Sequence, residues 1–168
     1  MSDCSTDGGV AKQAMCILSY GGNLTDTTIN YTLICFTLAA CIHALNSESP
    51  SFLFRRKAAA LTMLEISLWV FQLALCLVVG CSGVSIIWNA HIGYLMGLLR
   101  QAGRETPSRV VVLTVLLGLL VDGYYLLTAD ELTTTAHVCA ACLGYAVRIF
   151  VVSQAFPTNI ELLLFQQS

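Results

Sequence analysis

The chain has 168 residues, of which 57% are hydrophobic and only 11% are charged, and its mean hydropathy is +0.76. A soluble domain carries roughly 25% charged residues, so a soluble core of this size could not bury so much apolar surface. The net charge is -2 and no basic face is present, which excludes a protein that binds the nucleic-acid backbone. Composition therefore predicts an all-α, polytopic membrane protein with about five transmembrane helices.

The first 28 residues (1–28) are polar and rich in Gly, Ser, Thr and Asp, and we expect them to form an N-terminal arm. They contain no basic segment followed by an apolar stretch, so we expect no cleavable signal or transit peptide. N-glycosylation sequons begin at Asn23 and Asn30. The motif is short and frequent by chance, and Asn30 adjoins the first apolar segment, so we expect neither to be modified.

Five apolar segments follow and predict five membrane-spanning helices. They cover residues 29–45, 58–79, 84–99, 110–127 and 133–153, with a loop over 46–57. Pro157 ends the last helix, since proline cannot continue one. We therefore expect a transmembrane domain over 29–156 and a C-terminal tail over 157–168 that lies on a surface or against a neighbour.

The charges in the loops predict the topology. Lysine and arginine accumulate on the side of the membrane from which the chain is not translocated. The loops at 55–57 and 100–109 are basic, whereas those at 80–83 and 128–132 carry no basic residue. Five crossings satisfy this pattern, and they bring the turn at 80–83 and the start of the last helix to the same membrane surface.

The turn at 80–83 is Gly80-Cys81-Ser82-Gly83, the one interruption in the apolar stretch 58–99. Glycine reaches the backbone angles of a sharp reversal at no steric cost, which places Ser82 at the membrane surface. His137 lies about one turn into the fifth span, at the same surface. A serine beside a histidine can form an acyl-transfer dyad, because the imidazole accepts the hydroxyl proton.

This spacing resembles the pattern of the rhomboid family of intramembrane serine proteases over the second half of the chain. In that family Gly-x-Ser-Gly begins one helix, one complete helix follows, and Ala-His begins the next; here these are residues 80–83, 110–127 and Ala136-His137. The resemblance implies that Ser82 is the nucleophile, that His137 is the general base and that Gly144 lets the two catalytic helices pack closely. In the alternative interpretation, the Gly-Cys-Ser-Gly segment is a tight interhelical turn and His137 is a polar residue at a helix start.

Three ionisable residues fall within the predicted spans, namely Glu65, Asp122 and Arg148. Charges at such depth are costly unless they are paired or face water. Glu65 and Arg148 lie at similar depth, so we expect them to pair between the second and fifth spans. Asn89 and His91 fall in the middle of the third span on different faces, where interhelical hydrogen bonds are a better account than a haem or pigment.

His137, Cys139 and Cys142 are close in sequence but do not predict a metal site. Residues two apart on a helix point to different faces, so His137 and Cys139 cannot both face one ion. Most of the eight cysteines lie in apolar segments, where they act as small hydrophobes. We expect no metal and no cofactor.

The hypothesis that these features favour is a non-catalytic accessory subunit, on a degenerate rhomboid-like scaffold, that packs into a larger membrane complex. Its expected partners are other membrane subunits and lipids. The alternative is an active intramembrane protease that uses the Ser82/His137 dyad. The absence of a predicted signal favours the mitochondrial inner membrane, with the endoplasmic reticulum as the alternative.

Overall fold

A computed structural model describes residues 24–48, 51–79, 84–101, 108–128 and 131–152 of the chain. Within these ranges the protein is all-α, with five α-helices and one π-helical segment. The α-helices are α2 (Leu24–Glu48), α3 (Ser51–Val79), α4 (Ser85–Gln101), α5 (Arg109–Thr128) and α6 (Glu131–Ala146), and η2 (Val147–Val152) continues α6. The expected five-helix, all-α architecture is confirmed.

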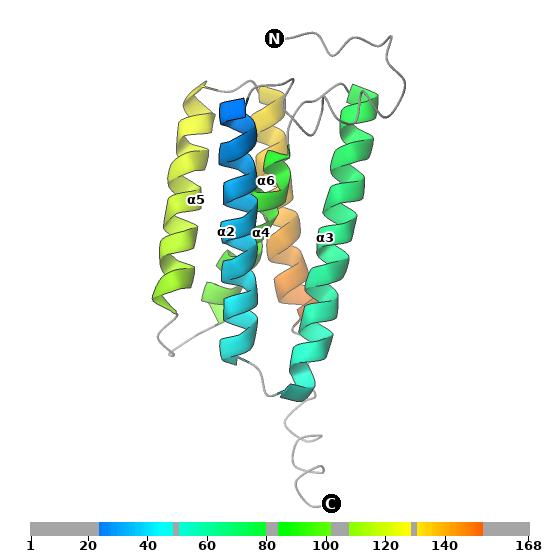
Figure 1. The fold of residues 1–168 in the computed structure, drawn as a ribbon, viewed down its shortest axis with the longest axis vertical. Helices are drawn as coiled ribbons and strands as arrows, with labels where there is room; N and C mark the ends of the chain where they lie inside the picture. Colours follow the sequence, from blue (N-terminus) through cyan, green and yellow to red (C-terminus); the bar gives the residue numbers. More distant parts are fainter. Residues whose placement is uncertain (1–23, 49–50, 80–83, 102–107, 129–130, 153–168) are drawn as a thin grey trace, which may run out of the picture.

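Helix α4 is the centre of the bundle. It contacts α2, α3, α5, α6 and η2, and in Figure 1 it lies behind α2, with α5 and α3 on either side. Side chains from Val84 to Leu98 are nearly all buried, and Ile87, Trp88 and Leu95 lie in the core. A helix that is buried all round needs no polar face, which explains why α4 is apolar on most of its circumference.

The helix bounds differ from the predictions mainly at the first two helices. The predicted loop over 46–57 was wrong, because α2 extends to Glu48 and α3 begins at Ser51. Pro50 separates the two helices in the sequence, and a proline restricts the helical conformation of the residue before it. Helix α2 also begins at Leu24, five residues before the predicted span, and Asp26 in its first turn complements the helix dipole.

The last predicted span ends in an irregular form. Residues 147–152 adopt the π-helical segment η2 instead of continuing the α-helix. Such segments are rare and frequently coincide with functional positions. Here the segment contains Arg148, whose side chain is buried against α4.

In the part of the chain that the structure describes, one helix is long and apolar enough to cross a membrane, namely Leu24–Ser47 within α2. The apolar helix Ala58–Ala74 within α3 is shorter. The core helix of a soluble protein and a signal sequence satisfy the same criteria of length and composition that α2 satisfies.

Candidate functional site

Helices α4 and α6 are in closer contact than any other pair in the described bundle. A Cβ atom added to Gly144 would lie 1.8 Å from the carbonyl oxygen of Ala90, and one added to Gly93 would lie 1.8 Å from that of Ala141. Each glycine thus lets the backbone of the other helix approach directly. The prediction that Gly144 permits close packing of these two helices is confirmed.

The start of α4 and the start of α6 meet in a group of four side chains, which we call the His137 cluster: Ser85, Trp88, Asp122 and His137. His137 Nε2 lies 2.8 Å from Ser85 Oγ. On the other side of the ring, Nδ1 lies 3.3 Å from Asp122 Oδ1 on α5, an ion-pair distance without hydrogen-bond alignment. The imidazole therefore lies between a hydroxyl and a carboxylate that come from two different helices.

Trp88 fixes the ring of His137 and connects the cluster to α2. Its ring lies edge-on to the imidazole at a centroid distance of 5.8 Å. Its indole Nε1 donates a hydrogen bond of 2.9 Å to Asn30 Oδ1, and Asn30 Nδ2 donates to the carbonyl of Asp26. Asn30 is fully buried, so its sequon cannot accept a glycan in this fold, and Asn23 lies outside the described residues.

Of the two residues of the predicted dyad, the structure describes only His137. His137 faces the first turn of α4, as expected, and is buried. Ser82 lies outside the described residues, and the hydroxyl that His137 contacts is that of Ser85. Sequence reasoning missed Ser85, which lies three residues after Ser82 in the sequence and begins α4.

Cys139 and Cys142 do not share this site. Both are free and exposed on α6, whereas His137 points into the bundle. The helical phase explains the separation, as residues two and five apart from a buried position turn outward. Among the described residues, no group of three or more His, Cys, Asp or Glu side chains could hold a metal ion.

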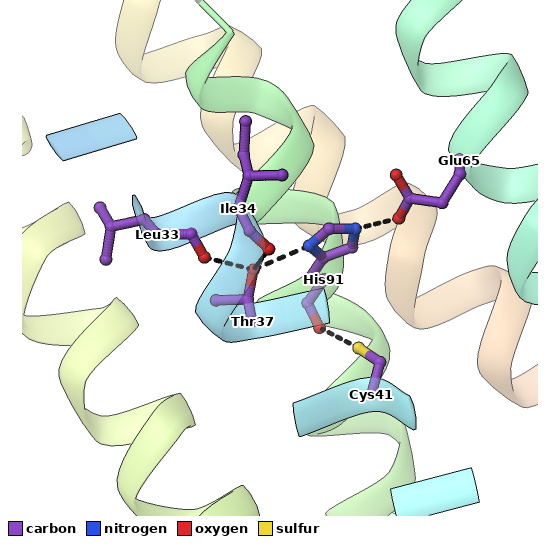
Figure 2. A network of polar contacts seen from close by, with 6 residues as sticks. All are labelled: Leu33, Ile34, Thr37, Cys41, Glu65 and His91. Atoms are coloured by element: carbon purple, nitrogen blue, oxygen red, sulfur yellow. Dashed lines mark hydrogen bonds and ion pairs between the residues drawn. The ribbon is translucent and has the colours of Figure 1, made fainter. Parts of the chain in front are cut away.

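A second set of polar contacts surrounds the middle of α4, and we call it the His91 network: Thr37, Cys41, Glu65 and His91 (Figure 2). His91 Nδ1 lies 2.8 Å from Thr37 Oγ1 on α2, and His91 Nε2 contacts Glu65 Oε1 on α3. The Cys41 thiol donates a long contact of 4.0 Å to the backbone carbonyl of His91. The network joins three helices through one imidazole.

The partner of Glu65 is thus a histidine that the sequence analysis treated separately. We expected Glu65 to pair with Arg148, and the structure pairs its carboxylate with His91. Arg148 is buried, with its guanidinium carbon 5.6 Å from the centre of the Tyr94 ring, a cation–π distance. The expected interhelical hydrogen bonding is confirmed for His91, whose partners come from α2 and α3. For Asn89 the structure shows a bond within α4, from its Nδ2 to the carbonyl of Ser85.

The two sites differ in what they can do chemically. In the His137 cluster, an imidazole beside a hydroxyl can accept its proton, and a carboxylate at the other nitrogen can hold the ring and stabilise the imidazolium. In the His91 network, an imidazole between a carboxylate and a hydroxyl can bind and release a proton.

Comparison of the chain with family models, with curated proteins and with solved structures finds no match. The rhomboid-like interpretation therefore stays a prediction that rests on the residues quoted above.

Proposed function

We propose that this chain is a multi-pass membrane protein that acts as a non-catalytic accessory subunit, with α2 as the helix that carries its partner. The proposal that the helices span a membrane is supported by where the apolar and the ionisable side chains lie. Large apolar side chains face outward along α5, among them Leu113, Leu116, Leu120 and Leu127. Ionisable groups lie inside, where His91, His137 and Arg148 are buried. A soluble bundle shows the reverse arrangement, whereas lipid favours apolar groups outside and paired charges inside.

A groove on the outer face of α2 carries the subunit proposal. It is open and lined by Thr28, Tyr31, Thr32, Cys35 and Phe36. These positions follow the three- and four-residue spacing of one helical face, and Thr28, Thr32 and Cys35 are exposed. The Thr28 hydroxyl already donates to the carbonyl of Leu24 within α2, so it is the shape of this face that favours a partner, because small residues let another helix approach closely. The occupant that this face fits is a transmembrane helix of a partner subunit.

The α2 proposal is tested with one substitution and its matched control. Thr32→Leu fills the groove, and Thr62→Leu makes the same change at an exposed site on α3 whose hydroxyl bonds to the carbonyl of Ala58 on the same helix. We expect Thr32→Leu to release the chain from a large complex on a native gel of source membranes, while Thr62→Leu stays in the complex. Migration of the wild-type chain alone, or release by neither variant, contradicts the proposal.

The same membranes test the localisation. We propose the mitochondrial inner membrane, and fractionation with markers for that membrane and for the endoplasmic reticulum distinguishes the two. Co-fractionation with the endoplasmic reticulum would favour the alternative and would leave the α2 interface as it stands.

The His137 cluster favours a second candidate, a serine hydrolase of rhomboid-like architecture. The nitrogens of His137 lie between a serine hydroxyl and a carboxylate in the order that acyl transfer uses. A serine oxygen would attack a carbonyl carbon, its proton would pass to Nε2 and then to the leaving group, and water would release the acyl group. Ser82 or Ser85 could supply this oxygen.

A fluorophosphonate probe separates the two candidates on the purified protein in nanodiscs. Labelling of the wild type that is lost in His137→Ala indicates an activated serine, and loss in Ser82→Ala or in Ser85→Ala identifies which one. An unlabelled wild type contradicts the hydrolase and leaves the subunit proposal in place.

A further inference from the structure

Both ring nitrogens of His91 are engaged by other helices, in the middle of the most buried helix. The His91 side chain is fully buried, and that of Glu65 is 16% exposed. A buried ion pair is costly to form, and removal of one partner is strongly destabilising because it leaves an uncompensated charge. The number of protons that His91, Glu65 and Thr37 share therefore determines the charge in the middle of the bundle.

The hydroxyl of Thr37 limits how those protons are arranged. It has one hydrogen and three acceptors within reach, namely the carbonyl oxygens of Leu33 at 2.8 Å and Ile34 at 3.2 Å, and His91 Nδ1 at 2.8 Å. Figure 2 shows these acceptors arranged around Oγ1. A hydroxyl donates one hydrogen and accepts through its lone pairs. The direction in which the Thr37 hydroxyl donates therefore decides whether Nδ1 carries a hydrogen.

Two arrangements of the hydrogens give a hydrogen-bond partner to the Thr37 hydroxyl, to both ring nitrogens of His91 and to the carboxyl group of Glu65. When the hydroxyl donates to a backbone carbonyl, Nδ1 carries a hydrogen and donates it to Oγ1, and one further proton is shared between Nε2 and the carboxyl group of Glu65. When the hydroxyl donates to Nδ1, that nitrogen is bare, and Nε2 donates its hydrogen to the Glu65 carboxylate. The first arrangement leaves the pair neutral and the second leaves it with one negative charge, so they differ by one proton.

The surroundings of the pair make both arrangements accessible. Burial in a low-dielectric interior favours the neutral pair. Arg148 from η2 is also buried in the bundle, and its positive charge favours the negative pair. Tyr94 on α4 lies under the Arg148 guanidinium.

Among the described residues of α5 and α6, the ionisable side chains near the interior are Asp122 and His137, which contact each other. The other ionisable groups described on these two helices lie at least partly exposed, and Tyr145 accepts a hydrogen bond from Arg100.

We propose that His91, Glu65 and Thr37 form a proton-binding site that joins α2, α3 and α4. As the pH falls, the site takes one proton from water onto Nδ1, and the Thr37 hydroxyl turns from Nδ1 to a backbone carbonyl. As the pH rises, that proton returns to water and the hydroxyl turns back. The proposal goes beyond the subunit function and is independent of whether α2 carries a partner.

The test uses the full chain in nanodiscs and two measurements of the same proton. Proton uptake is followed with an indicator dye after a pH step, and nitrogen-15 NMR on histidine-labelled protein reports whether Nδ1 carries a hydrogen. We expect a wild-type Nδ1 signal that changes from bare to protonated as the pH falls, assigned by its loss in His91→Gln. We expect Glu65→Gln to lose this transition and the associated uptake.

Thr37→Val removes the hydroxyl with little change in size, and Thr62→Val is its matched control because the Thr62 hydroxyl is exposed and bonds to the carbonyl of Ala58 on its own helix. We expect Thr37→Val to abolish the transition or move its midpoint by about one pH unit or more, the equivalent of about 1.4 kcal/mol, while Thr62→Val leaves it in place. The proposal is overturned when wild-type Nδ1 keeps one state over the whole pH range in which the fold is intact. It is also overturned when Thr37→Val titrates as Thr62→Val does.

Discussion

Helix α4 is held by α6 and by α3 in two different ways. Against α6 the backbones pack closely, because a carbonyl group of the opposite helix lies directly against Gly93 and another against Gly144. Against α3 the contact depends on a polar group, since Glu65 reaches across to His91. In Figure 1, α3 stands at the edge of the bundle, and α6 packs against α4 more extensively than α3 does. One neighbour of α4 is thus held by close backbone packing, whereas the contact with the other includes a buried polar group.

The largest effect is expected from Gly144→Ala. The added Cβ would lie 1.8 Å from a backbone oxygen of Ala90, and a backbone atom cannot move aside as a side-chain end can. We expect the loss in unfolding free energy to reach or exceed the about 1–3 kcal/mol of ordinary overpacking. Thermal unfolding in detergent measures it.

Gly123→Ala is the control for this change. A Cβ at Gly123 on α5 would meet nothing within 4 Å, so this variant should gain about 0.5–1 kcal/mol from the lower entropy of the unfolded chain. Equal stability of the two variants would show that the α4–α6 contact is not limited by its glycines.

The next largest effect is expected from Glu65→Ala, which tests the polar contact. It leaves a ring nitrogen of His91 buried without its partner, which costs about 1–3 kcal/mol. Unfolding measured for Glu65→Ala, His91→Ala and the double variant gives the coupling between them. A coupling near zero would show that α3 is held by its apolar contacts alone.

A smaller effect is expected from Asn30→Ala, which removes the acceptor of the Trp88 indole. We expect a loss near the lower end of about 1–3 kcal/mol, because the buried indole N–H is left without its acceptor. Trp88 fluorescence should also shift as its ring loses this contact. Thr32→Ala on the exposed face of α2 is the control, and an identical effect of both changes would exclude a specific role for the bond.

The smallest effect is expected from Arg100→Gln. Arg100 is exposed and donates to the Tyr145 hydroxyl near the ends of α4 and α6. We expect the unfolding free energy to stay within about 0.5 kcal/mol of wild type, as for most surface substitutions. A larger loss would place part of the α4–α6 stability in this polar contact instead of in the two glycines.

The sequence predicted the helices well because their signal is local. Continuous apolar segments and the breaks between them located all five helices, and the predicted loop at 46–57 failed because two short polar stretches continue as helix. Gly144 was also predicted correctly, since a glycine beside small residues on a helix indicates close packing.

The sequence by itself thus determined the fold class and the order of the helices. Only the tertiary structure decided the partners of the polar residues, placing Ser85 and Asp122 at His137 and His91 at Glu65. The physical reason is that the rotation and axial shift of one helix against another follow from side-chain packing between them. Ser82 and Ser85 lie three residues apart in the sequence, and spacing along a single chain does not measure such a shift.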